Sequence, residues 1–169
     1  GMYHKQKEDN GIMEKPNILL GRIDNRLVHG QVGVSWTNYL GANLIIVADD
    51  EVAQNEIQQE IMEMVAMTSS ADIRFFSIQD TIDLIWNAAP EQKIFIITKT
   101  PKEMRALIDN NVPIEQVNVG NMHLSEGKRQ ISQKVFVDDE DMENLHAMQE
   151  KGVRVYIQEI PGKLEEALK

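Results

Sequence analysis

Short apolar runs alternate along most of the chain with longer segments whose apolar residues recur at helical spacing. The short runs, which are rich in Ile, Val, Leu and Phe, predict strands, and the longer segments predict helices. The predicted strands are 17–23, 43–49, 72–78, 93–99, 116–120, 134–137 and 153–160, and the predicted helices are about 28–40, 51–67, 79–88, 101–110 and 139–150. Several strands are apolar at nearly every position, which is typical of strands buried on both faces.

This alternation predicts an α/β fold, an open and mostly parallel sheet of about seven strands with helices on both faces. In such sheets ligands bind beyond the carboxyl ends of the strands, near a switch in strand order. The first predicted strand ends at about Ile23, so the polar stretch that follows it lies where such a fold builds its site.

The length of 169 residues is typical of one domain, which we place at 15–169. The segment 1–14 is mostly polar, lacks the apolar centre of a secretion signal, and is expected to be a disordered extension. No apolar run approaches the roughly 18 residues that a membrane-spanning helix needs.

Composition removes several classes of function. The chain has no cysteine, which excludes disulfides and thiol nucleophiles, and its net charge of −10 argues against general binding of nucleic acids. The four histidines show no spacing typical of metal ligands, and no glycine-rich nucleotide fingerprint follows the first strand. We therefore expect no metal and no cofactor, and we interpret the acidic stretch 48–51 as the start of a helix.

The stretch "RIDNRLVHGQV" (22–32) carries the candidate chemistry. A neutral imidazole attacks phosphorus near neutral pH, so His29 is a candidate phosphoryl acceptor. Arg26 is placed to bind phosphoryl oxygens, Asp24 to orient either the imidazole or the arginine, and Gly30 to let the backbone approach the phosphate. An ordinary loop ion pair beside a structural histidine explains the same residues, and spacing alone leaves both readings open.

A second stretch, "VNVGNMHLSEGKRQI" (117–131), follows a strand predicted at the same edge of the sheet. Gly120, Asn121 and Met122 either close the pocket around His29 or form an ordinary turn. His123 is either a second catalytic histidine or part of the pocket wall.

Some residues are candidates for partner contacts rather than for chemistry. We expect a basic rim for docking, and Trp36 either packs against the sheet or joins a docking face. The expected rim comprises Arg22, Arg26, Lys128 and Arg129.

With these residues in view, the chain resembles the IIB component of the mannose-family sugar phosphotransferase system, a family that includes mannose, fructose, sorbose and N-acetylgalactosamine members. The family pattern Asp-x-Arg-Leu-x-His-Gly-Gln is filled by Asp24, Arg26, Leu27, His29, Gly30 and Gln31. The similarity runs from about Pro16 to Pro161 and includes "VNVGNM" and "EGK". The stretches "GQVGVSWT" and "VNVGNMHLSEGK" look most like members for N-acetylgalactosamine or galactosamine.

The resemblance implies a function and a set of partners. A IIB component takes a phosphoryl group from a phosphohistidine of a IIA protein, and here it would hold the group on His29, with Nδ1 favoured. It then gives the group to a sugar during uptake by the membrane subunits IIC and IID. This implies a cytoplasmic protein associated peripherally with the transporter, possible homo-oligomers, and phosphoryl contacts from Arg26.

One departure from the family concerns position 35, where mannose-type members have arginine and this chain has Ser35. The departure puts in doubt a phosphate or partner contact at that position. The alternative reading of the whole chain is an orphan regulatory or phospho-ligand-binding domain that feeds no transporter.

Overall fold

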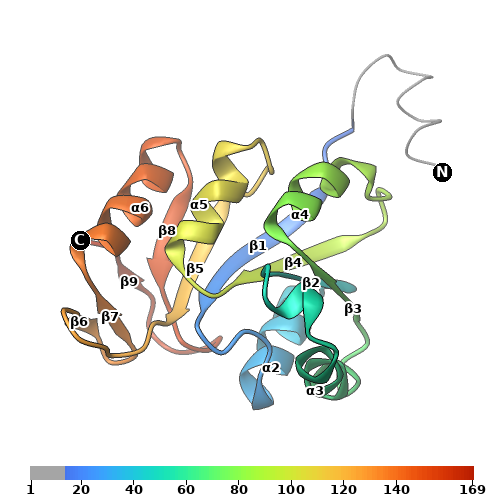
Figure 1. Cartoon of the computed structure of the whole chain (residues 1–169), viewed down its shortest axis with the longest axis horizontal. Helices are drawn as coiled ribbons and strands as arrows, with labels where there is room; N and C mark the ends of the chain where they lie inside the picture. The colour runs from blue at the N-terminus through green and yellow to red at the C-terminus, as the bar shows by residue number, and fades with distance from the viewer. Residues whose placement is uncertain (1–13) are drawn as a thin grey trace.

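The computed structural model describes residues 14–169, so the predicted extension 1–14 lies, apart from Glu14, outside the described residues. A seven-stranded sheet with the order β3-β2-β4-β1-β5-β8-β9 forms the centre (Figure 1). All its strand pairs are parallel except β8 with β9. Its strands are β1 (Asn17–Asp24), β2 (Leu44–Ala48), β3 (Asp72–Phe76), β4 (Lys93–Thr98), β5 (Gln116–Asn121), β8 (Arg154–Ile157) and β9 (Glu166–Ala167).

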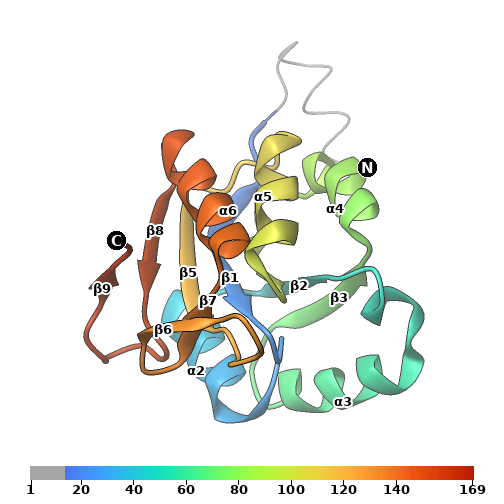
Figure 2. The ribbon, with the colours of Figure 1, turned by 60° about the vertical axis from the view of Figure 1, so that its left-hand side comes forward.

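Helices cover both faces of this sheet. On one face lie α2 (Gly30–Leu40) and α3 (Glu56–Ala66), and on the other lie α4 (Ile78–Leu84), α5 (Pro101–Asp109) and α6 (Asp139–Glu150) (Figures 1 and 2). Short 3-10 turns, Val52–Gln54 and Ile85–Asn87, precede α3 and follow α4. The α/β fold with a mostly parallel sheet and two helical layers is therefore confirmed.

Each helical layer has its own apolar core. Trp36 of α2 and Met62 of α3 pack against one face of the central strands, and Met104 and Leu107 of α5 pack against the other face together with Leu145 of α6. Burial of apolar area on both faces is the main force that holds such a sheet together. This explains why the central strands are apolar at nearly every position.

Two elements differ from the predicted strands. The run 134–137 becomes β7 (Val135–Val137), which pairs antiparallel with β6 (Arg129–Ser132) in a separate hairpin instead of joining the sheet. The seventh strand of the sheet is β9, a two-residue strand without an apolar run to predict it. The run 153–160 is a strand only as far as Ile157.

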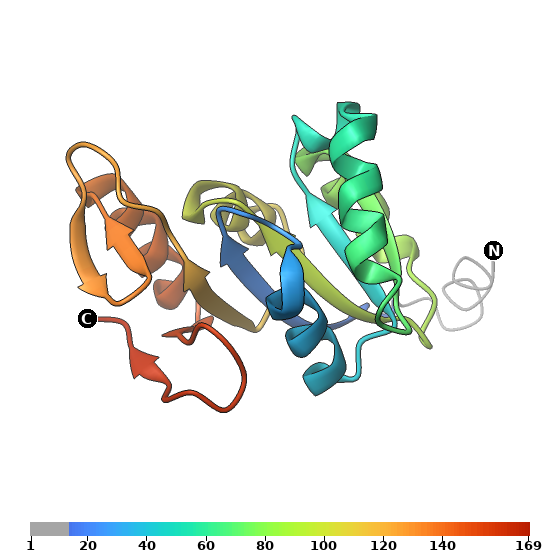
Figure 3. The same ribbon diagram turned by 90° about the horizontal axis from the view of Figure 1, so that it is seen from below.

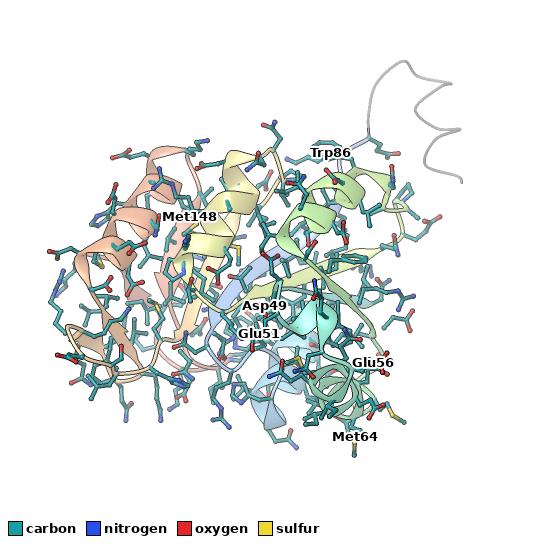
Figure 4. The ribbon with its side chains drawn as sticks, viewed as in Figure 1. Asp49, Glu51, Glu56, Met64, Trp86 and Met148 are labelled. Atoms are coloured by element: carbon teal, nitrogen blue, oxygen red, sulfur yellow. The ribbon has the colours of Figure 1, made fainter. Side chains whose placement is uncertain are left out.

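The methionines of α3 are a further difference. We expect a methionine in an amphipathic helix to pack inward, and Met62 does so, but Met64 is 69% exposed and points away from the sheet (Figure 4). Position 64 lies on the outer side of the helix, which accounts for this exposure.

The order of the strands places a switch point between β1 and β5. The chain leaves β1 through α2 on one face, toward β2, and leaves β5 through the hairpin and α6 on the other face, toward β8. Figure 3 shows the hairpin at one end of the molecule and α3 at the other, with α2 between them. The carboxyl ends of β1 and β5 therefore form the edge at which a ligand site is expected.

Candidate active site

His29 lies at the junction between β1 and α2, where it is the N-cap residue of the helix with an extended backbone. Its side chain does not cap the helix. The first amides of a helix have no partner within it and carry the positive end of the helix dipole, which favours an anion there. Gly30 adopts a φ of +47°, in the left-handed region that favours glycine, and a Cβ there would contact no residue beyond its chain neighbours.

The imidazole of His29 is turned toward Asp24. Its Nε2 lies 3.1 Å from Oδ2 of Asp24, which also accepts a hydrogen bond from the Arg22 guanidinium at 3.0 Å. The other carboxylate oxygen of Asp24 accepts the backbone N–H of Arg26 at 2.9 Å. Since a carboxylate only accepts hydrogen bonds, Nε2 must carry the proton, and the lone pair of the neutral ring is then on Nδ1.

Asp24 is a carboxylate in this setting in spite of its complete burial. Burial acts to raise the pKa of Asp24, but the hydrogen bond with His29, the charge of Arg22 and the amide of Arg26 outweigh it and hold the pKa below its ordinary value. Burial lowers the pKa of Arg22 from its ordinary value, against the opposing charge of Asp24. Arg22 and Asp24 form a buried ion pair, with Nη2 of Arg22 3.0 Å from Oδ2 of Asp24.

Arg22 is buried at the base of the same site, with 2% exposure. Its guanidinium donates to Oδ1 of Asn118 at 2.5 Å and to the carbonyl of Gln158 at 3.3 Å, and it lies 5.4 Å from the centre of the Trp36 ring. Gly120 lies beneath it, and a Cβ at position 120 would stand 2.1 Å from the Arg22 Cζ. Glycine at position 120 therefore lets the Arg22 guanidinium lie directly against the backbone of β5, where any other residue would collide with it.

The predicted basic rim is wrong. Arg22 is buried against Asp24, and the Trp36 ring is 1% exposed with its indole N–H donating to the carbonyl of Glu159 at 2.9 Å, so neither residue is available on a docking face. Lys128 pairs with Asp138 and Asp141, and Arg129 pairs with Asp139. The acidic first turn of α6 neutralises these two cations, and only Arg26 of the predicted rim remains exposed and without an ion pair to any residue of 14–169.

A cleft of about 510 Å³ opens beside His29. Asp24, Arg26 and His29 line it from the β1–α2 loop, while Asn121, Met122 and His123 line it from the end of β5. The structure therefore brings the two informative stretches of the sequence to one cleft, as the shared sheet edge predicts.

Asn25 joins the two walls of this cleft. Its side-chain amide donates to the carbonyl of Lys99 at 2.9 Å, and its side-chain oxygen accepts the backbone N–H of His123. Its own backbone N–H donates to the carbonyl of Asn121 at 3.1 Å. These contacts hold the β1–α2 loop against the ends of the neighbouring strands β4 and β5.

Other predicted site residues lie outside the lining of the cleft. Gln31 is exposed on the first turn of α2, Ser35 is half-buried one turn later, and Lys128 is held by α6. Gly120 lies behind Arg22 rather than in the cleft.

Six lining residues are not among the predicted site residues. Val32 and Leu124 belong to the two stretches already discussed, and the other four are Gln133, Lys134, Phe136 and Glu159. Lys134 lies in the turn of the hairpin, and Glu159 follows β8. No local pattern marks them, because each reaches the cleft only through the tertiary arrangement of the hairpin and of the last strands.

The acidic stretch after β2 behaves as predicted for the start of a helical turn. Asp49, labelled in Figure 4 beside Glu51, accepts the backbone N–H of Val52 at 3.0 Å and lies 3.6 Å from Lys99. Within residues 14–169, no group of three or more His, Asp or Glu side chains is arranged to hold a metal ion. In the same part of the chain, none of the helices has the length and apolar character needed to span a membrane.

Comparison with known proteins supplies an independent line of reasoning. Residues 18–169 match the model of the family described as "PTS system sorbose subfamily IIB component", where PTS denotes the phosphotransferase system. Over 156 residues the chain is 54% identical to the N-acetylgalactosamine-specific phosphotransferase enzyme IIB component 1 of Escherichia coli K12, covering 92% of this chain and 99% of that protein.

Solved structures agree with this match. The crystal structure of the N-acetylgalactosamine-specific IIB component 1 from Escherichia coli superposes with a TM-score of 0.89 at 54% identity, covering 90% of this chain and all of that one. A N-acetylgalactosamine IIB component from Streptococcus pyogenes superposes with a TM-score of 0.82 at 35% identity, covering 90% of this chain and 93% of that one.

Proposed function

The chain belongs to the sorbose subfamily of IIB components of the phosphotransferase system, and from this premise we propose that His29 receives a phosphoryl group at Nδ1 and passes it to a sugar. IIB components are phosphotransferases, so the reaction class follows from the family, while the acceptor atom and the roles of its neighbours are our proposal. The observation that supports it best is the contact of His29 Nε2 with the Asp24 carboxylate, which leaves Nδ1 as the nucleophile.

The first step exchanges one nitrogen–phosphorus bond for another. Nδ1 of His29 attacks the phosphorus of a phosphohistidine on IIA, the new Nδ1–P bond forms, and the bond to the donor imidazole breaks with its electron pair left on the donor nitrogen. The Nε2 proton stays between the ring and Asp24 throughout, and the Nε2–H becomes more acidic as the Nδ1 lone pair bonds to phosphorus and positive charge develops on the ring. Asp24 stabilises the charge that develops on the imidazole, and buried Arg22 keeps Asp24 ionised and in place.

The second step returns His29 to its starting state. A sugar hydroxyl oxygen attacks the phosphorus, the Nδ1–P bond breaks with its electron pair left on Nδ1, and the hydroxyl proton leaves to solvent or to a base of the membrane subunit. Throughout both steps the first amides of α2 and the exposed guanidinium of Arg26 bind the phosphoryl oxygens. Both steps depend mainly on positioning and on charge stabilisation.

N-acetylgalactosamine, or galactosamine, is the sugar that the relatives favour. The 54%-identical protein and the Streptococcus pyogenes structure are both named for N-acetylgalactosamine. IIB components work with IIA, with the membrane subunits IIC and IID, and with the sugar. We infer that this chain docks peripherally on such membrane subunits, which supply the sugar site.

A phosphorylation assay tests the acceptor. The protein is incubated with labelled phosphoenolpyruvate, the general phosphotransferase proteins and IIA, and acid-labile, base-stable phosphate is measured. The His29→Ala variant is expected to take up none. The His123→Ala variant is the matched control, because His123 lines the same cleft and is expected to leave labelling intact. Labelling of His29→Ala would refute the proposed acceptor.

A second assay separates transport from regulation. Membranes that contain IIC and IID are added with N-acetylgalactosamine, galactosamine or mannose, and sugar phosphate is measured. N-acetylgalactosamine or galactosamine is expected to be phosphorylated in preference to mannose. Phosphorylated protein that never yields sugar phosphate would favour the regulatory alternative.

A further inference from the structure

We propose that Lys134 is a second cation of the phosphoryl site, which binds phosphoryl oxygens from the wall of the cleft opposite Arg26. The inference rests on the proposed function of His29 and adds a catalytic residue to it. The resemblance of the first motif to known IIB components does not include this position, which lies in the turn of the β6–β7 hairpin.

The location of Lys134 carries the argument. It lines the same cleft as His29 and Arg26, although it lies more than a hundred residues away along the chain. Its side chain is exposed, and it forms no ion pair with any residue from Glu14 onward. An exposed ammonium group that lines the same cleft as His29, and that forms no ion pair with a carboxylate of the described residues, is suited to bind a doubly charged phosphoryl group.

The backbone of Lys134 is fixed, although its side chain is long. Its carbonyl accepts the backbone N–H of Met122 at 2.9 Å, and the carbonyl of Met122 accepts the N–H of Phe136 at 3.0 Å. Met122 also forms a parallel bridge with Val135. These bonds tie the hairpin to the end of β5, so the stem of Lys134 starts from a defined place in the wall of the cleft.

The neighbouring cations have other partners. Lys128 is bound to Asp138 and Asp141, and Lys163 lies 3.2 Å from the Glu159 carboxylate. Arg22 is committed to Asp24. Of the cations that line the cleft, Arg26 and Lys134 are therefore the two without an ion pair among residues 14–169.

These two residues act on the same step from different sides. In the transfer from IIA, negative charge spreads over the three oxygens of the phosphoryl group while the bond to the donor nitrogen breaks and the bond to Nδ1 forms. One cation on each wall holds those oxygens between them, and the charge that Lys134 supplies also stabilises phospho-His29 relative to the phosphohistidine of IIA.

The test compares single-turnover rates of phosphoryl transfer from phospho-IIA. We expect Lys134→Met to slow transfer about tenfold, which is less than the loss of an enclosed oxyanion donor because the lysine is open to solvent. Lys134→Glu is expected to slow it further, and Lys134→Arg to keep most of the rate. The equilibrium between phospho-IIA and phospho-IIB is expected to shift toward IIA in Lys134→Met, a change that a purely structural residue would not cause.

The matched control is Lys102→Met. Lys102 is an exposed lysine on α5, away from the His29 cleft, so its loss changes the net charge equally and is expected to leave transfer unchanged. Rates for Lys134→Met and Lys134→Glu equal to that of Lys102→Met would overturn the inference. If the unmodified protein accepts no phosphoryl group, the proposed function fails instead, so the two failures are distinguishable.

Discussion

Replacement of Gly120 by alanine tests whether the position of the Arg22 guanidinium matters for His29. Arg22 bonds Asp24, and Asp24 in turn contacts His29. The new Cβ would stand 2.1 Å from the Arg22 Cζ, whereas an ordinary carbon contact begins near 3.4 Å, so the guanidinium must withdraw by about 1.3 Å. Its bonds to Asp24 at 3.0 Å and to Asn118 at 2.5 Å do not survive a movement of this size.

The expected loss of stability follows from those contacts. Hydrogen bonds to charged groups contribute about 1.5–3 kcal/mol each, and a broken buried ion pair costs about 3–5 kcal/mol, so we expect Gly120→Ala to lower the free energy of unfolding by about 3 kcal/mol. The assay is urea denaturation at pH 7, followed by the phosphorylation assay on folded protein. Labelling is expected to slow, because Asp24 loses the partner that positions it.

Two controls make the result specific. Gly21→Ala places a Cβ in the adjacent strand β1, 3.0 Å from the flexible Met104 Sδ. It is expected to lower the free energy of unfolding less than Gly120→Ala does and to leave labelling unchanged. In an Arg22→Ala background there is no guanidinium for the new Cβ to displace. Gly120→Ala should therefore lower the free energy of unfolding of that variant only slightly. A cost of Gly120→Ala that is equal in both backgrounds, or normal stability together with normal labelling, would refute the reasoning.

Two further predictions concern a buried and an exposed carboxylate. Asp24→Asn is expected to destabilise the protein by about 3 kcal/mol at neutral pH, because it leaves Arg22 buried without its counter-charge. Since the folded protein lowers the pKa of Asp24, the stability that Asp24 adds is present above its unfolded pKa of about 3.9 and is lost as pH falls through the lower folded value. The difference in free energy of unfolding between the unmodified protein and Asp24→Asn, measured by urea denaturation, should therefore become smaller below about pH 4. A difference that becomes larger there would contradict this account. Asp138→Ala removes the side-chain cap of α6, which accepts the N–H of Asp141 at 2.8 Å, and is expected to cost about 1 kcal/mol. Asp139→Ala, one residue later on a fully exposed side chain, should not change the denaturation midpoint, and equal effects of the two variants would exclude a capping role.

Local sequence patterns predict most helices and strands and place His29, the proposed phosphoryl acceptor, directly after the first strand. Alternating apolar runs predicted the strand–helix order, because burial on both faces of a parallel sheet imposes a local pattern that is visible within each segment. The bounds 139–150 and 101–110 were predicted almost to the residue, since an acidic first turn and Pro101 mark where those helices begin. His29 at the end of the first strand followed from the same local logic.

The surroundings of His29 depend on contacts between segments that lie far apart in the sequence. The burial of Arg22 depends on Asn118 and Gln158, which lie 96 and 136 residues away along the chain. Lys134 reaches the cleft because the β6–β7 hairpin is bonded to Met122 at the end of β5. From the sequence we expect Arg22 to be exposed, because it lies beside a polar loop and no local pattern indicates which distant segment packs over it. Local periodicity encodes the solvent exposure of a segment's faces, whereas contacts between distant segments depend on strand order and register.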